Sequence, residues 1–456
     1  MLDILISDAT VLLPHAAGVA RHQTVGVEAG RIALLRAADA EADAALEAAT
    51  RIDGRGRLVM PGLVDCHTHT GQQLLKGRVL DELPMIWTRI MLPFESTLTP
   101  ELMRLSAELS ALEMIKSGTT SLVDAGSYFM DEAASVYEAA GLRATLSVST
   151  MDQPGLPASI AMTCDEAVAA ADDLYERWDG AANGRIRVAY ALRALMSCSE
   201  ELIRKTADHA NERGALLQAH MNEYATEVNY TLQNQGVRPF EYLERLGGVL
   251  SERFLGAHCL MLSEVEKNIL VERGVKVCHC PFSNCAKATP ETPSLRSRGV
   301  IEGLGTDGAA HGGLSLWAEM RLFRSIMNVT HGVPIADPAV MPARAIVNMA
   351  TESGAAFMGT EGAGAVELGA VADLITVDLV NPGMYPTGNV VNTLVECAGA
   401  ADVRDMIVDG RLVMRDREVL TLDEAAIMER AAGYQAHLDD MAEAAARSAE
   451  KSGAVA

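Results

Sequence analysis

The stretch "MPGLVDCHTHTGQQLLKG", residues 60–77, places two histidines one residue apart at the end of an apolar run. Alternate residues of a β-strand face the same side, so His67 and His69 are expected to point in one direction. In a barrel of parallel strands, chemistry takes place at the carboxyl ends of the strands. The stretch therefore predicts a buried strand that ends in two ligands of one metal ion.

From about residue 60 to residue 310, apolar strand-like runs alternate with helical patterns, which is typical of βα units in a parallel sheet. The runs are "GLVDCHTH", "TTSLVDAG", "RATLSVST", "IRVAYAL", "ALLQAHMNE", "FLGAHCL", "VKVCHCPFSN" and "VIEGLGTDGA". Eight such strands are the number that closes a (β/α)₈ barrel. We therefore predict an α/β fold of this kind.

The two ends of the chain show a different pattern. The first sixty residues, and the segments "GAVELGAVADLITVDL" and "VRDMIVDGRLVMRDREVL", consist of short strand-like pieces separated by Gly and Asp turns. We expect the chain to return at its end to the small sheet with which it begins. The tail is rich in Ala and Glu, which favours a helix on the outside of the protein.

Composition limits the class of protein. With 456 residues and 49% hydrophobic content, the chain can bury a large core and form more than one domain. A net charge of −23 repels phosphate backbones and anionic membranes, so neither nucleic acid nor a membrane is an expected partner. The 8 cysteines form no C-x-x-C pair and suit reduced thiols. Without a signal peptide or a long apolar run, a cytoplasmic protein is expected.

Five of the predicted strands end in residues that bind metals or carry protons. They are His67 and His69, His220 with Glu223, His258, His279, and Asp307. One such histidine alone is more often a hydrogen-bonded core residue, but their joint placement at one end of the strands favours a site. Three imidazoles with the Asp307 carboxylate give an N₃O set that suits catalytic zinc or ferrous iron. The scattered histidines are interpreted as structural: His15, His22, His209, His331 and His437.

The ordered motifs "PGLVDCHTH", "GTTSLVD", "HMNE", "AHC", "CPFSN" and "GLGTDG" resemble the amidohydrolase superfamily, in particular its aminohydrolases of nitrogen heterocycles. The resemblance implies a distorted (β/α)₈ barrel over residues 59–366. It also implies a β-sandwich built from residues 1–58 and 367–422, followed by a helix and tail at 423–456. The implied cofactor is one divalent metal ion, with zinc first and ferrous iron or manganese as alternatives.

The resemblance also implies roles for single residues. The implied metal ligands are His67, His69, His220 and Asp307. Glu223 matches the acid that shuttles protons, and His258 matches the histidine that orients the attacking water or the tetrahedral centre. The loop over residues 283–299 departs from the family's pattern, so the resemblance says nothing about the wall of the pocket that this loop forms.

The chemistry explains these residue types. A metal lowers the pKa of bound water from roughly 15.7 to about 7, which supplies hydroxide for attack on the ring carbon that bears the leaving group. Glu223 would carry a proton from the water to a ring nitrogen, and Asp307 would relay a second proton to the leaving amine. His258 would stabilise the developing charge. We therefore predict a hydrolytic deaminase that acts on the C–N bonds of cyclic amidines.

Two residues favour a ring with an amino group near a carbonyl, as in guanine, a pterin or a related pyrimidine. Arg193 and Gln72 match positions at which guanine deaminases are similar to this chain, and a guanidinium donates to carbonyls. A salt bridge at the barrel rim explains Arg193 equally well. The segment "YALRALMSCSE" lacks the "PHxPY" of nucleoside deaminases, so an adenosine or S-adenosylhomocysteine substrate is the weaker alternative. A triazine amino- or chlorohydrolase with the same metal centre stays open.

The segment over residues 71–95 is long and contains Met85, Trp87 and Met91, so we expect it to form a lid or a pocket wall. Trp87 is a candidate for stacking on a ring, with a subunit contact as the alternative. His311 follows the aspartate of "GLGTDG" closely enough to touch the substrate. The expected partner is a small heterocyclic molecule, and the expected assembly is a homodimer or a higher homo-oligomer.

Overall fold

The computed structural model describes residues 1–79, 86–360 and 362–451, and each of the eight predicted strand-like runs contains a strand. The strands are β6 (Leu63–His69), β7 (Thr119–Asp124), β8 (Arg143–Leu146), β9 (Ile186–Val188), β10 (Tyr190–Ala194), β11 (Leu217–Met221), β12 (Phe254–His258), β13 (Lys276–His279), β14 (Glu302–Leu304) and β15 (Asp307–Gly308). Neighbouring strands are parallel, as the alternation of strands with helices predicts.

In the described part of the chain these strands form two five-stranded sheets, and the single closed sheet that we expected is not seen. The orders are β15-β6-β7-β8-β9 and β10-β11-β12-β13-β14. The fourth and eighth strand positions are each broken into two pieces, because β9 ends at Val188 just before β10 begins at Tyr190, and β14 similarly precedes β15. The two pieces of each position pair with different sheets. An isolated parallel bridge between Thr150 and Leu192 links the sheets.

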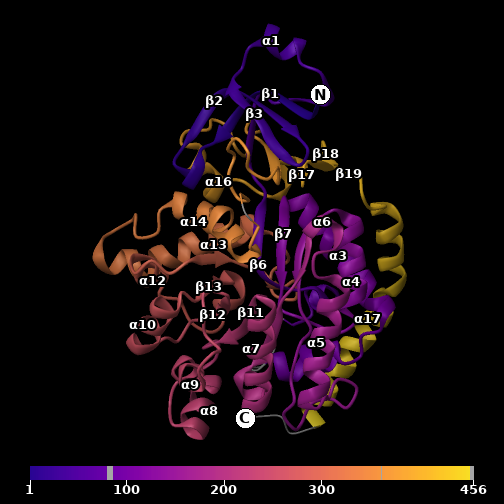
Figure 1. Ribbon diagram of the computed structural model, residues 1–456, viewed down its shortest axis with the longest axis vertical. Coiled ribbons are helices and arrows are strands. Elements are labelled where there is room, and N and C mark those ends of the chain that lie inside the picture. The colour runs from indigo at the N-terminus through magenta and orange to yellow at the C-terminus, as the bar shows by residue number, and fades with distance from the viewer. Residues whose placement is uncertain (80–85, 361, 452–456) are drawn as a thin grey trace.

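Both ends of the chain meet in one further sheet of nine strands, which lies above the parallel sheets in Figure 1. Its strands are β1 (Leu2–Leu12), β2 (Val19–Glu28), β3 (Arg31–Ala37), β4 (Ala48–Asp53), β5 (Arg57–Pro61), β16 (Leu374–Asp378), β17 (Val403–Val408), β18 (Arg411–Arg415) and β19 (Glu418–Val419). The antiparallel pairing of β5 with β16 joins the two ends. The expected return of the chain is therefore seen. Strand pairing connects the nine strands in one sheet, and this pairing does not confirm the predicted sandwich.

Helices connect and cover the strands, and none of those in the described ranges is long and apolar enough to cross a bilayer. They are α1 (Ala40–Ala45), α2 (Leu92–Glu95), α3 (Pro100–Ser117), α4 (Met130–Ala140), α5 (Cys164–Trp178), α6 (Ala181–Gly184), α7 (Glu200–Arg213), α8 (Ala225–Gln235), α9 (Pro239–Leu246), α10 (Glu264–Arg273), α11 (Pro281–Asn284), α12 (Thr292–Ser297), α13 (Leu316–Met327), α14 (Ala343–Met349), α15 (Glu352–Met358), α16 (Val390–Glu396) and α17 (Glu424–Lys451).

Helix α3 shows how local sequence sets these boundaries. The Thr99 side chain accepts from the backbone N–H of Leu102 at the start of the helix, and Pro100 occupies the first turn, where a missing N–H costs nothing. The helix ends at Gly118, which has a φ of 82° that a residue with a side chain rarely adopts. Its apolar side packs into the largest core cluster, which includes Met103 and Trp317.

The C-terminal helix α17 packs against the body of the protein over the segment that we expected to form a lid (Figure 1). Its Leu438 belongs to an apolar cluster that also contains Leu74 and Phe94. Arg78 donates to Asp439 of the helix at 2.6 Å. The tail therefore covers the described part of the 71–95 segment, whereas Met85 lies outside the described residues.

A buried ion pair joins the two kinds of sheet. Arg143 begins β8, and its guanidinium donates to the carboxylate of Asp373, just before β16, at 2.9 and 3.2 Å. Both side chains are only 5% exposed. Asp373 also accepts from the backbone N–H of Asp409 at 2.7 Å. Removal of one partner would leave a buried charge without compensation.

We predict that Arg143→Met lowers the free energy of unfolding by about 3–5 kcal/mol, as expected when a buried ion pair loses one partner. Urea denaturation followed by circular dichroism measures this change. The control is Arg447→Met, because Arg447 forms an exposed pair with Glu443 at 3.0 Å, and such pairs contribute only about 0.3–0.5 kcal/mol. Equal losses in the two variants would contradict a role for Arg143 in joining the sheets.

Candidate metal centre and active site

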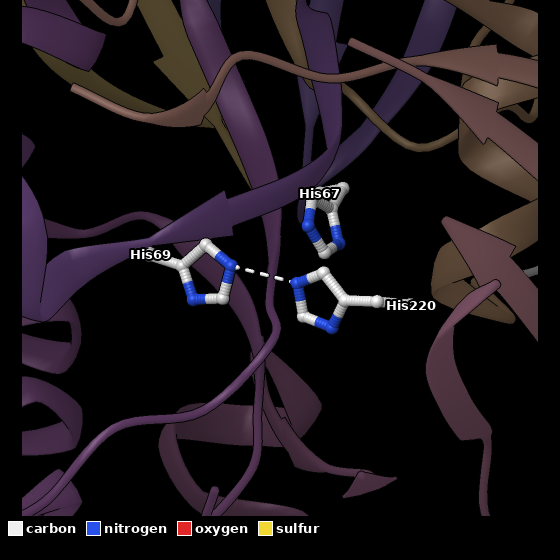
Figure 2. Close-up of side chains that lie close together, drawn as sticks. All are labelled: His67, His69 and His220. Carbon is white, nitrogen blue, oxygen red and sulfur yellow. Dashed lines mark hydrogen bonds between the residues drawn. The ribbon is translucent and has the colours of Figure 1, made fainter. Parts of the chain in front are cut away.

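Three histidine side chains converge where the carboxyl ends of the two parallel sheets meet (Figure 2). His67 and His69 come from β6, where alternate residues face one side, and His220 comes from β11. The Nε2 atoms of His69 and His220 are 3.1 Å apart, and the ring of His67 lies 4.8 Å from that of His220 between centroids. The three side chains are buried. The structure thus brings together the three predicted nitrogen ligands.

Asp307 of β15 supplies the predicted carboxylate. Its Oδ1 lies 3.7 Å from Nε2 of His67 and 3.4 Å from Nε2 of His69. Burial alone would raise the pKa of Asp307, but the nearby His311, His258 and Lys287 hold it well below its usual range. Asp307 therefore places an anionic carboxylate beside the three rings, where the predicted oxygen ligand is expected. His67 belongs both to the cluster with His69 and His220 and to a second cluster with His258 and Asp307.

The polar atoms of this cluster fit a divalent cation. Both ring nitrogens of His67 and Nδ1 of His69 are buried without a hydrogen-bond partner. Burial lowers the pKa of His67 to about 3 and also lowers the pKa of His69 and His220 well below the usual range. Neutral imidazoles offer lone pairs, and three of them with one carboxylate are a common donor set for catalytic zinc. The residues therefore fit the implied metal ion.

Glu223 lies three residues beyond His220, at the edge of the same cluster. Its Oε1 is 3.6 Å from Nε2 of His258 and 2.5 Å from Nζ of Lys287. Its backbone N–H donates to the carboxylate of Glu227 at 2.9 Å. Burial opposes ionisation, but His258 and Lys287 lower the pKa of Glu223. The predicted proton carrier is therefore an ionised carboxylate that can accept a proton.

The orientation of His258 is set from behind by Asn284 of α11. The hydrogen-bond network favours the orientation in which the Asn284 amide nitrogen donates to Nδ1 of His258 at 2.9 Å and to the carbonyl of Cys280 at 3.3 Å. An accepting Nδ1 leaves the proton on Nε2 in the neutral ring. His258 then directs an N–H toward the carboxylates of Glu223 and Asp307, which lie 3.6 and 4.0 Å away.

A pocket opens beside the cluster, and all the predicted substrate-binding residues lie on its walls. The pocket is lined by His69, Gln72, Trp87, Met91, Arg193, Ala194, Met196, His220, Glu223, Tyr224, Glu227, Asp307 and His311. His311 has 11% of its side chain exposed, and its Nε2 lies 3.5 Å from Oδ2 of Asp307. Its ring therefore faces the cluster.

Arg193 and Gln72 are both bound to Glu95, a residue that the sequence analysis missed. Arg193 donates to Glu95 at 3.2 and 3.4 Å, and the Gln72 amide nitrogen donates to it at 2.7 Å. The Arg193 guanidinium also lies 5.6 Å from the centre of the Trp87 ring. The pair is 3% and 1% exposed, so the salt bridge that we considered for Arg193 exists, but it is buried in the pocket wall and not at the rim.

His279 does not join the cluster, although it follows a predicted strand. Its Nδ1 donates to the carbonyl of His258 at 3.0 Å, and its ring stacks on Phe323. Its Nε2 lies 3.5 Å from the buried carboxylate of Glu302. His279 therefore supports the neighbouring strand from behind. Four of the scattered histidines pair with polar groups outside the site: His15, His22, His209 and His331.

Known proteins of similar sequence include deaminases. A 5'-deoxyadenosine deaminase of Methanosarcina mazei is 36% identical over 442 residues, which cover 94% of this chain and 97% of the relative. A 5-methylthioadenosine/S-adenosylhomocysteine deaminase of Desulforudis audaxviator is 36% identical over 437 residues, which cover 94% and 97%. These relatives confirm the predicted class of enzyme, a hydrolase that acts on C–N bonds in cyclic amidines.

Solved structures of similar shape agree with the fold. A zinc-bound adenosine deaminase from Xanthomonas campestris has a TM-score of 0.88 and 29% identity, over 96% of this chain and 99% of that chain. A guanine deaminase from C. acetobutylicum shares the fold at a TM-score of 0.81 and 19% identity, over 90% and 100%. The sequence profile of the Amidohydrolase family matches residues 58–413. This chain therefore belongs to the amidohydrolase family.

Proposed function

We propose that this chain is a metal-dependent hydrolytic deaminase of an amino-substituted ring that also bears an oxygen substituent, such as an oxopurine or a pterin. The observation that carries the proposal is the position of Arg193, whose guanidinium lines the same pocket as Glu223 and the histidine cluster. A buried guanidinium is a donor that a ring carbonyl or a ring nitrogen can accept from. The products would be the ring carbonyl and ammonia.

His67, His69, His220 and Asp307 are the residues that would hold the metal ion. When bound, the ion would act as a Lewis acid and lower the pKa of water in the pocket. The N₃O donor set supports zinc, and the structurally similar adenosine deaminase from Xanthomonas campestris contains bound zinc.

The protein's own residues move the protons. Glu223 accepts a proton from the attacking water and donates it to the ring nitrogen beside the reacting carbon. The Nε2–H of His258 donates to the oxygen that adds to this carbon and so stabilises the charge that develops there. Asp307 accepts the second proton of the water and passes it to the leaving amine. This assignment uses one acid–base group for each proton that the hydrolysis transfers.

A second candidate substrate is a 5'-modified adenosine. The relatives with 36% identity, of which this chain covers nearly the full length, are 5'-deoxyadenosine and 5-methylthioadenosine/S-adenosylhomocysteine deaminases. The reacting amidine of adenosine is the same chemical group, so Glu223, His258 and Asp307 would serve it equally. The candidates differ in the ring substituent that would meet Arg193, which lines the pocket in front of Glu95.

We predict that His69→Ala weakens metal binding by at least tenfold, because it removes one of four donors. Even the loss of a residue that only supports a metal ligand lowers metal affinity by about 10–100-fold. Inductively coupled plasma mass spectrometry of the purified protein measures the amount of bound metal. His331→Ala is the matched control, since Nε2 of His331 donates to the carbonyl of Pro290 at 3.0 Å, outside the cluster. A full complement of metal in His69→Ala would contradict the ligand assignment.

Glu223→Gln is expected to retain the metal but to lower kcat by about 10²–10⁴-fold, because an amide of the same size cannot carry the proton. A coupled assay of ammonia release measures the loss. Glu272→Gln makes the same chemical change at an exposed position and should leave turnover unchanged. If the Glu223→Gln enzyme turns over at the wild-type rate, Glu223 is not the proton carrier.

A substrate panel separates the two ring classes. Ammonia release from guanine and pterins should exceed that from adenosine derivatives, and Arg193→Met should lower kcat/KM for the oxygen-bearing rings by about 10–100-fold. This loss corresponds to a hydrogen bond to a charged group of about 1.5–3 kcal/mol. Turnover of adenosine derivatives alone would overturn the role of Arg193 and favour the second candidate. Chloride release from a chlorinated triazine, without deamination, would overturn both.

A further inference from the structure

A buried lysine lies beside the site, in the loop that departs from the family's pattern. Lys287 follows α11, and its side chain is only 4% exposed. Its ammonium lies 2.5 Å from Oε1 of Glu223, 2.6 Å from Oγ of Ser283 and 5.0 Å from the centre of the Tyr224 ring. Removing an ammonium from water is costly unless it is paired and hydrogen-bonded. Its contacts therefore indicate what the lysine does.

These contacts connect the two carboxylates that the proposed reaction uses. The Ser283 hydroxyl donates to Oδ2 of Asp307 at 2.6 Å and accepts from Lys287, while Lys287 also donates to Glu223. The ammonium lies 4.0 Å from Oδ2 of Asp307 itself. Burial alone would lower the pKa of Lys287, but Glu223 raises it above its usual value, so the lysine is cationic. One fixed cation thus holds two carboxylates that would otherwise repel each other.

Lys287 acts through Glu223 and not on the substrate. It is not among the residues that line the pocket, whereas Glu223, Tyr224 and Asp307 are. A carboxylate that receives a proton at one point and delivers it at another must keep its position, because a displacement of about 1 Å can cost 10²-fold in rate. Of the groups near Glu223, His258 at 3.6 Å is too distant for a hydrogen bond, so Lys287 is the closer restraint.

We propose that Lys287 is a positioning residue that fixes the Glu223 carboxylate at the metal cluster and, through Ser283, keeps Asp307 in place. The inference rests on the proposed function, because it concerns the residue that carries the proton. A purely structural alternative is that Lys287 only ties the loop over residues 283–299 to the body of the protein. That alternative predicts a loss of stability with normal turnover.

The test compares Lys287→Met with a matched control. Lys287→Met should lower kcat by about a hundredfold, as for a displaced catalytic group, with little change in KM or in bound metal. Lys267→Met is the control. The Lys267 side chain is similarly buried, at 3% exposed, and is paired with two carboxylates, Glu264 and Glu291, but it lies on α10 away from the pocket. Lys287→Arg keeps the cation and should restore part of the lost kcat.

A double variant excludes a loss that is only structural. In Glu223→Gln with Lys287→Met both members of the pair are removed, so this protein is expected to fold even where Lys287→Met alone does not. Adding Lys287→Met to Glu223→Gln should lower turnover by much less than the hundredfold expected in the wild type, because only the indirect hold on Asp307 through Ser283 is then lost. The decrease in thermal midpoint of the double variant should be smaller than the sum of the decreases in the two single variants.

Three outcomes would overturn the proposal. The first is a normal kcat in Lys287→Met. The second is that Lys287→Met lowers turnover by the same factor in Glu223→Gln as in the wild-type protein. The third is an additive change in thermal midpoint, which would show that the two side chains do not interact. A wild-type enzyme that releases no ammonia from any ring would instead overturn the proposed function, and with it the role of Lys287.

Discussion

The closeness of three uncharged histidines and one carboxylate is the constraint on which the rest of the structure depends. Buried nitrogens without hydrogen-bond partners are costly, and both ring nitrogens of His67 are of this kind. The cluster takes residues from β6 and β15 of one parallel sheet and from β11 of the other. A ligand that satisfies the four side chains would therefore also tie the two sheets together at their carboxyl ends, in addition to the isolated bridge between Thr150 and Leu192.

A second constraint is the charge balance of the pocket. The chain has a net charge of −23, yet the pocket depends on two buried cations, each of which is paired with a carboxylate. Arg193 is paired with Glu95, and Lys287 is paired with Glu223. Because a buried charge that loses its partner is destabilising, a change in either cation also affects the carboxylate with which it is paired. Position, charge and proton transfer in this pocket are thus coupled through ion pairs.

Local patterns predicted the strands and the histidine cluster because a strand and the residues at its end are encoded within a few positions. The H-x-H of β6 and the histidine of β11 are examples. The partner of Arg193 could not be found in this way, since Glu95 is 98 residues away in the chain and its segment has no recognisable pattern. Lys287 is 64 residues from Glu223, in a loop without a family precedent. The break at Ala189 was also missed, because "IRVAYAL" has the pattern of one continuous strand.

Under the proposed function, the buried pair of Arg193 and Glu95 is the feature that would set the choice of ring while the reaction stays the same. Hydrolysis of every aminated heterocycle involves the same proton transfers at the water, the ring carbon and the ring nitrogen. Glu223, His258 and the cluster therefore need not differ between substrates. The other ring substituents would meet Arg193, whose guanidinium is already neutralised by Glu95. A neutral carbonyl can accept from the remaining N–H groups of Arg193 without disturbing the pair, whereas an anionic ring would have to compete with Glu95 for the same cation. Under the proposed function, the pair is therefore expected to favour an uncharged hydrogen-bond acceptor on the ring.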